Sequence, residues 1–190
     1  MADGAFDVLV ICGSLRKGSF NAALARALPA LAPASLALRY AAPLDSIPPY
    51  NADVQDAGNP PPVVALTEAI RAADGLIIVS PEYNWSIPGV LKNAIDWVSK
   101  VKDQPFLGKS VALQSCAGGL LGGSRMQYHL RQALTSIEAQ ILIRPEVFVT
   151  FAAKKFAATT LELTDQPTKD MVKLQLEAYE KFLRRWTKKP

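Results

Sequence analysis

Short, almost wholly apolar runs alternate five times with helical segments along this chain, and that alternation leaves few folds open to it. The first run, residues 6–12 (FDVLVIC), is rich in β-branched residues and stops at a glycine. A continuous apolar run of this length is typical of a strand buried on both faces, as in a parallel sheet. Further strands are expected at residues 36–40, 75–80, 109–114 and, interrupted by a proline, at 141–143 with 147–149.

Between these strands, apolar residues recur at helical spacing. Helices are expected at residues 21–31, 63–73, 89–100, 124–139 and 168–188, and a proline-rich surface loop at 43–62. This order predicts an α/β fold, a doubly wound parallel sheet with helices on both faces. The 190 residues are expected to form a single domain, residues 1–190. Right-handed crossovers would bring the carboxyl end of every strand to one edge of the sheet, where ligands bind.

Composition and charge exclude several classes of protein. Hydrophobic residues make up 49% and charged residues 20% of the chain, the balance of a soluble globular domain. No window approaches the ~20 consecutive apolar residues of a membrane helix, so no membrane span is expected. The last ten residues hold five Lys or Arg, whereas residues 1–180 carry 16 basic and 17 acidic side chains. A basic helix end is what the helix dipole favours, so no nucleic-acid partner is expected.

Two cysteines and one histidine limit the redox and metal chemistry. Cys12 and Cys116 lie far apart and outside any CxxC motif, so we expect reduced thiols in a cytoplasmic protein. The N-terminal segment has no basic leader, so no export signal is expected. With His129, these thiols are too few for a structural zinc site, and no bound metal is expected.

The loop after the first strand, residues 13–21 (GSLRKGSFN), runs directly into a helix. A helix N-terminus binds anions, and Ser14, Ser19 and Asn21 add hydroxyl and amide donors. The guanidinium of Arg16 can pair with phosphate oxygens. The segment is neither a Walker loop nor a GxGxxG motif, and so many hydroxyls suit a phosphate monoester better than a pyrophosphate. The alternative is a capping loop whose polar side chains only satisfy helix amides.

Two further strand-end loops are unusual. Residues 81–89 (PEYNWSIPG) place Tyr83 and Trp85 between prolines, and flat side chains at this edge suit a flat heteroaromatic ring. Residues 115–123 (SCAGGLLGG) hold four glycines, which let the backbone approach a ring edge or let a lid move. The alternatives are surface or interface aromatics in the first loop and a flexible turn in the second.

A monophosphate cradle and a platform for a planar ring would meet at the switch point of a sheet with strand order 2-1-3-4-5. FMN is the cofactor with that shape, and flavodoxin binds it at such a switch point. The sequence shows no GxSxG motif, Cys–His pair or metal cluster, and a flavin needs none because its ring carries the hydride. We therefore predict bound FMN, with no catalytic side chain.

Three segments carry a resemblance to a known family: GSLRKGSFN, PEYNWSIPGVLKNAIDW and GGSRMQYHLRQ. At these segments the chain resembles NAD(P)H-dependent FMN reductases and, among them, bacterial chromate and quinone reductases, over residues 6–149. The resemblance implies a flavodoxin-like fold, tightly held FMN, NADPH or NADH as donor, and quinones as acceptors. It also implies promiscuous reduction of chromate, other oxidised metal ions, azo or nitro compounds, and assembly as a homodimer or homotetramer.

Carried over residue by residue, the resemblance assigns the cofactor site. The phosphate side comprises Ser14, Arg16, Lys17, Gly18, Ser19, Phe20 and Asn21, and the ring side comprises Pro81, Glu82, Tyr83, Asn84, Trp85, Ser115 and Ala117. Trp85 stands where the family often has tyrosine, and Ala117 where a polar residue is common. We expect the first departure to alter ring stacking and the second to remove a hydroxyl contact.

A second group of residues points to a subunit contact. Arg125 and Tyr128 lie one turn apart, off the core side of their helix, and Glu146 follows the proline of the fifth strand. Arginine–carboxylate pairs suit interfaces, so we predict that these three pair across subunits; a solvated helix face is the alternative. The helix at 89–100 has an apolar arc of about 160°, which also favours burial by a partner. His129 is expected at the surface or in an interface.

We expect NAD(P)H and then a quinone to stack on the same flavin face, with hydride carried at flavin N5, which predicts ping-pong kinetics. Three alternatives stay open: an FMN reductase that supplies free reduced flavin, a non-enzymatic electron carrier of the flavodoxin type, and an NAD(P) sensor without turnover. A carrier would present a strongly acidic surface, which the nearly neutral body of this chain disfavours.

Overall fold

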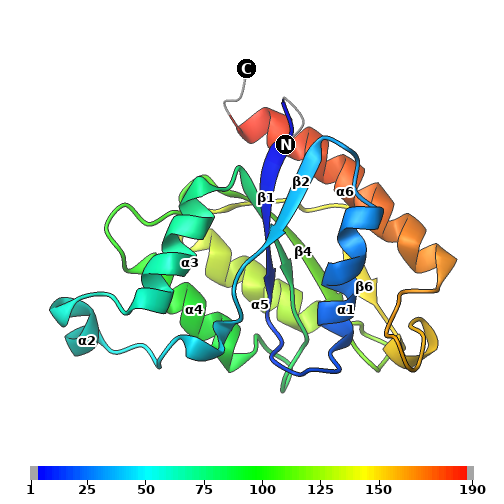
Figure 1. Ribbon diagram of the computed structural model, residues 1–190, viewed down its shortest axis with the longest axis horizontal. Coiled ribbons are helices and arrows are strands. Elements are labelled where there is room, and N and C mark those ends of the chain that lie inside the picture. The colour runs from blue at the N-terminus through cyan, green and yellow to red at the C-terminus, as the bar shows by residue number, and fades with distance from the viewer. Residues whose placement is uncertain (1–3, 188–190) are drawn as a thin grey trace.

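The computed structural model describes residues 4–187 and is built around a parallel sheet (Figure 1). Its strands are β1 (Phe6–Cys12), β2 (Leu36–Tyr40), β3 (Gly75–Val79), β4 (Ser110–Cys116), β5 (Gln140–Ile141) and β6 (Val147–Val149). The order β2-β1-β3-β4-β5 confirms the predicted topology, and every pairing is parallel. The expected fifth strand is two short strands, both paired with β4, because Pro145 between them has no N–H for the ladder.

Helices cover both faces of the sheet, as expected of a doubly wound fold. They are α1 (Phe20–Ala27), α2 (Ala52–Ala57), α3 (Pro61–Ala72), α4 (Gly89–Ser99), α5 (Ser124–Thr135) and α6 (Gln166–Trp186). Helices α1 and α6 pack on one face, and α3, α4 and α5 pack on the other (Figure 1). The predicted end of the last helix at residue 188 lies outside the described residues.

The two cores meet the sheet through alternate residues of the same strands. In β3, Ile77 and Val79 belong to the core under α1 and α6, whereas Leu76 and Ile78 belong to the core under α3, α4 and α5. All five residues of β3 are buried. This two-sided burial is the reason that the strands show continuous apolar runs instead of alternation.

The proline-rich segment at 43–62 is more ordered than predicted. It contains α2, which begins where the Asn51 side chain accepts a hydrogen bond from the Asp53 amide at 2.9 Å. The same segment covers α4: Trp97 Nε1 donates to Pro48 O at 2.8 Å, and the Tyr50 ring packs edge-on against Trp97. The wide apolar arc of α4 is therefore buried by the chain itself, and the partner subunit inferred from that arc is not needed.

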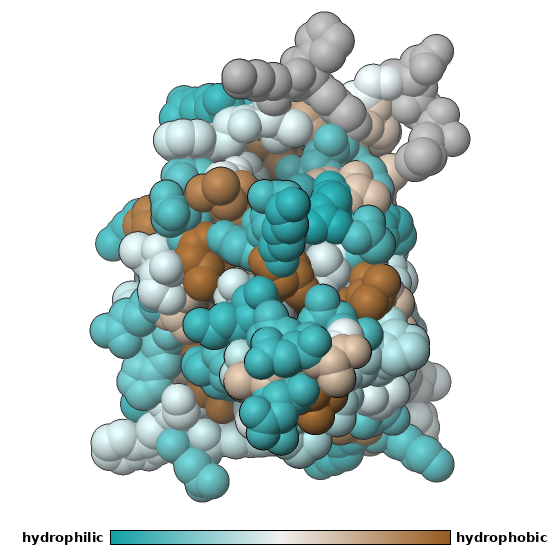
Figure 2. Space-filling view, turned by 90° about the vertical axis from the view of Figure 1, so that its left-hand side faces the viewer, coloured by the Kyte–Doolittle hydropathy of each residue, from teal (hydrophilic) through white to brown (hydrophobic). Residues whose placement is uncertain are grey.

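The surface of this part of the molecule is mixed in character. Figure 2 shows the side that carries α2 and α3, where apolar side chains are scattered among hydrophilic ones. Among residues 4–187, no helix combines the length and the apolar character that crossing a bilayer requires.

Candidate active site

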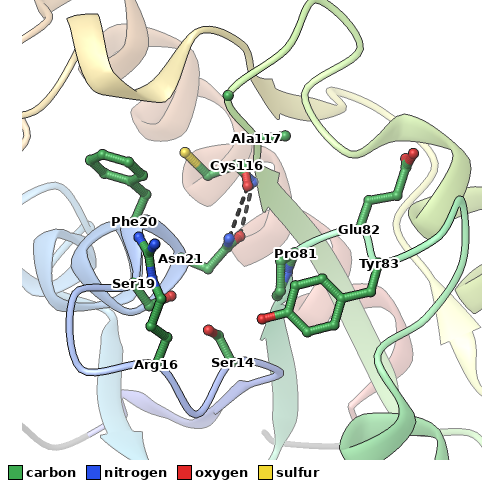
Figure 3. Close-up of a pocket in the computed structure, with 11 residues that line it drawn as sticks. Ser14, Arg16, Ser19, Phe20, Asn21, Pro81, Glu82, Tyr83, Cys116 and Ala117 are labelled. Carbon is green, nitrogen blue, oxygen red and sulfur yellow. Dashed lines mark hydrogen bonds between the residues drawn. The ribbon is translucent and has the colours of Figure 1, made fainter.

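A cavity of about 470 Å³ lies where the carboxyl ends of β1, β3 and β4 meet (Figure 3). It is lined by three loops that are far apart in the sequence. The first loop contributes Ser14, Arg16, Ser19, Phe20 and Asn21, the second Pro81, Glu82 and Tyr83, and the third Cys116, Ala117 and Gly118. Nine of the fourteen predicted cofactor residues therefore line one cavity. Five predicted residues do not line it, namely Lys17, Gly18, Asn84, Trp85 and Ser115, whereas Cys116 and Gly118 line it without having been predicted.

The loop after β1 is arranged as an anion site. Ser19 is the N-cap of α1, and its side chain accepts a hydrogen bond from a first-turn amide at 3.2 Å. The Arg16 guanidinium donates to Gly18 O and lies over the Phe20 ring. Within the described chain, the backbone N–H groups of residues 14–18 donate to no protein acceptor. These amides remain available to a bound anion at a helix N-terminus.

Asn21 lines the cavity and is also hydrogen-bonded to the end of β4. Its amide oxygen and one amide hydrogen are bonded to the backbone of Cys116, as the dashed lines in Figure 3 show. The side chain is therefore held against the end of β4, and whether it also reaches a phosphate stays a prediction.

The loop after β3 contains a tight two-residue turn. Tyr83 and Ser86 exchange both backbone hydrogen bonds, at 3.1 and 2.9 Å. The residues between them, Asn84 and Trp85, have φ angles of 48° and 67°. Positive φ at both central positions is the pattern of a type I′ turn. The turn places the half-exposed Tyr83 ring in the cavity wall, whereas Trp85 stands outside it and is 68% exposed.

The loop after β4 is packed at its far end. The Ser115 hydroxyl is buried, donates to Gly122 O at 2.6 Å and accepts from the Gln127 side chain at 2.8 Å. Gly122 has a φ of 57°, and a Cβ there would lie 2.8 Å from the backbone of Phe148. This glycine therefore serves close packing, and movement of the loop as a lid stays a prediction.

Two thiols stand close to the cavity and both are free. Burial raises the pKa of the Cys116 thiol to about 12, and burial also raises the pKa of Cys12. Both thiols are therefore uncharged at neutral pH and are weak nucleophiles.

The three predicted interface residues are not paired with one another inside the chain. Arg125 pairs with Glu82, Glu146 lies 3.6 Å from Arg131, and Tyr128 is 52% exposed beside Phe148. Pairing across subunits stays a prediction. The contact of Arg125 with Glu82 was missed, because the two residues are 43 positions apart and no local pattern joins them.

The residues present fit a phosphate monoester joined to a flat ring. An added Cβ on Gly118, which lines the cavity, would meet no protein atom within 4 Å, so this side of the cavity has open space. Unbonded amides lie at one end and the Tyr83 ring at the other. A doubly wound sheet with such a site at its switch point is typical of a flavin-binding protein of the flavodoxin-like fold.

Comparison with known proteins agrees with this class. Residues 6–154 match the family model of NADPH-dependent FMN reductases. The chain is 48% identical over 179 residues to a quinone reductase of Escherichia coli (strain K12), covering 94% of this chain and 95% of the relative. It is 43% identical over 178 residues to an NAD(P)H-dependent FMN reductase of Pseudomonas aeruginosa, with the same shares covered.

A solved structure shows the same fold. The flavoenzyme FerB, an NAD(P)H:acceptor oxidoreductase of Paracoccus denitrificans, superposes with a TM-score of 0.87 at 30% identity, covering 96% of this chain and 100% of FerB. The chain belongs to the NADPH-dependent FMN reductase family, and it is an NAD(P)H-dependent FMN oxidoreductase. Family membership sets aside the electron-carrier and sensor alternatives.

Proposed function

We propose that this enzyme reduces quinones by two electrons, and that chromate, other oxidised metal ions, azo and nitro compounds are incidental acceptors. The observation that carries the proposal is the cavity at the carboxyl edge of the sheet, with the Tyr83 ring half-exposed in its wall. A flat side chain at the opening suits a flat acceptor. The name of the Escherichia coli relative, a quinone reductase, supports the same acceptor class.

The chain's residues bind and orient the cofactor, and bound FMN supplies the hydride chemistry. The phosphate would be held by the loop after β1, with Ser14, Arg16, Lys17, Gly18, Ser19, Phe20 and Asn21. The ring would lie between the loops after β3 and β4, with Pro81, Glu82, Tyr83, Asn84, Trp85, Ser115 and Ala117. Placing donor and acceptor against one fixed site removes most of the entropy cost of bringing them together.

The kinetic part of the proposal is that donor and acceptor use the same opening in turn, which gives ping-pong kinetics. Initial rates measured at several fixed quinone concentrations, with NADPH varied, should give parallel double-reciprocal lines. Converging lines would show that both substrates are bound together. An anaerobic absorbance spectrum, taken before and after NADPH is added, tests for bound flavin independently of any acceptor.

A second candidate is an FMN reductase that supplies free reduced flavin. The name of the Pseudomonas aeruginosa relative favours it. The two candidates differ in flavin retention: a quinone reductase keeps its FMN through gel filtration, whereas a flavin supplier elutes without it.

We also propose a homodimer or homotetramer in which Arg125, Tyr128 and Glu146 lie at a subunit contact. A cytoplasmic location is part of the same proposal, because both cysteines are free thiols. Light scattering of the purified protein gives the assembly state directly.

A further inference from the structure

We propose that Arg125 is a positioning residue that holds the loop after β3 against α5, and with it the ring-side residues Glu82 and Tyr83. The proposal rests on the proposed ring-side role of this loop. It adds a function for Arg125 within one subunit, separate from any subunit contact. Three observations carry it.

The first observation is the buried carboxylate of Glu82. Its side chain is 8% exposed and accepts a hydrogen bond from Arg125 Nε at 2.7 Å. The other carboxylate oxygen accepts from the Met126 amide at 3.3 Å, in the first turn of α5. The N-cap of α5 is Gly123, which has no side chain to cap the helix. Glu82 therefore caps α5 from the neighbouring loop, and removing Arg125 would leave a largely buried charge without its cation.

The second observation is the position of the Arg125 guanidinium over Trp85. The guanidinium carbon lies 4.4 Å from the centroid of the indole ring. Trp85 occupies the second central position of the type I′ turn, where glycine is preferred, at a φ of 67°. A residue held in such a conformation persists where its surroundings over-determine it. Arg125 supplies one of those contacts, through a cation–π interaction.

The third observation is a second cavity beside the main one, with Arg125 in its wall. This cavity, of about 410 Å³, is lined by Arg125 and the glycine-rich loop, and it shares Glu82 and Ala117 with the main cavity. In Figure 3 the Glu82 side chain points away from Tyr83 and the other labelled residues. The ion pair thus holds the Glu82 carboxylate beside Arg125, and Glu82 belongs to the wall of both cavities. Losing Arg125 would free this charge to turn back toward the ring.

The test compares Arg125→Gln with Arg184→Gln. Arg184 is a matched control, because it also pairs with a glutamate, Glu180, and lies over an aromatic ring, Phe6. Hydrogen exchange of residues 81–88 is measured in the flavin-free protein, and FMN is then titrated into each variant. In Arg125→Gln we expect about tenfold faster exchange and about tenfold weaker FMN binding. Arg184→Gln should match the wild type. Arg125→Lys, which keeps the positive charge, should show exchange and FMN binding close to those of the wild type.

Two outcomes would overturn the proposal. One is wild-type exchange of residues 81–88 in Arg125→Gln. The other outcome involves two variants. Arg125→Gln would show faster exchange together with a lower mass in light scattering, and Glu82→Gln, which removes the same ion pair, would show unchanged exchange. Because exchange is measured without FMN, it tests the loop even if the wild type binds no flavin. Failure of the wild type to bind FMN would instead overturn the proposed function.

Discussion

The side-chain amide of Asn21 is hydrogen-bonded to both backbone polar atoms of Cys116, which lies 95 positions further along the chain. Asn21 Nδ2 donates to Cys116 O, and the Cys116 amide donates to Asn21 Oδ1, each at 2.9 Å. The contact joins the first turn of α1 to the end of β4. It therefore couples the phosphate side of the cavity to the loop on its opposite side.

Replacing Asn21 by alanine should lower the free energy of unfolding by about 2–3 kcal/mol, because two buried backbone groups lose their partners. FMN binding should weaken as well, since the two loops are no longer joined. Urea unfolding of the flavin-free protein and FMN titration measure these effects. Gln166→Ala, at an exposed pair with Asp170, is the control. A loss below about 0.5 kcal/mol would show that the contact contributes little.

Gly13 and Gly18 should respond differently to alanine. A Cβ on Gly13 would lie 2.3 Å from Ser80 Oγ and 2.8 Å from Ser80 Cβ, so Gly13→Ala should cost about 1–3 kcal/mol of stability. Gly18 is exposed outside the cavity lining, and a Cβ there would meet nothing within 4 Å, so Gly18→Ala should leave stability unchanged and weaken FMN binding only through the proposed contact of this loop with the phosphate. Thermal unfolding measures the expected loss of stability in Gly13→Ala, and FMN titration measures the expected loss of binding in Gly18→Ala. Unaltered FMN binding in Gly18→Ala would show that the phosphate does not lie against residue 18.

The Cys116 thiol should make the protein less stable at alkaline pH. Burial raises its pKa from 9.0 to about 12, so between these values the unfolded chain loses a proton that the folded chain keeps. Stability then falls as pH rises above 9, by up to about 1.4 kcal/mol per pH unit from this group. Cys116→Ala lacks this contribution, so its stability deficit should narrow between pH 8 and about 10.5. A deficit that is constant with pH in urea unfolding would contradict the assignment.

Tyr128→Ala should lower the mass of the assembly in light scattering if this face of α5 is a subunit contact. Tyr128 is 52% exposed in the single chain, so its ring is available to a partner, and the alanine variant would remove that contact area from the interface. Leu174→Ala on α6, at a side chain that is 56% exposed, is the matched control and should leave the mass unchanged. Equal masses for both variants would remove the support for this interface.

Local patterns in the sequence were sufficient for the sheet and for the loops of the site. The run at residues 6–12 forms β1 with those bounds, and the order of the five strands is the expected one. The loops after β1, β3 and β4 meet at one cavity, as the right-handed crossover rule requires. These features follow from hydrophobic periodicity and from glycine and proline positions, which act over a few residues.

Contacts between distant residues were decided by the tertiary structure. No pattern in the sequence pairs Asn21 with Cys116, or Glu82 with Arg125, since each pair depends on how elements far apart in the chain pack together. Hydrophobic and turn patterns therefore predicted which loops form the site, whereas packing placed Trp85 under a guanidinium and outside the cavity. Hydrophobic periodicity is a local property of the chain, but the partner of a polar side chain is set by whichever groups burial brings within hydrogen-bond distance.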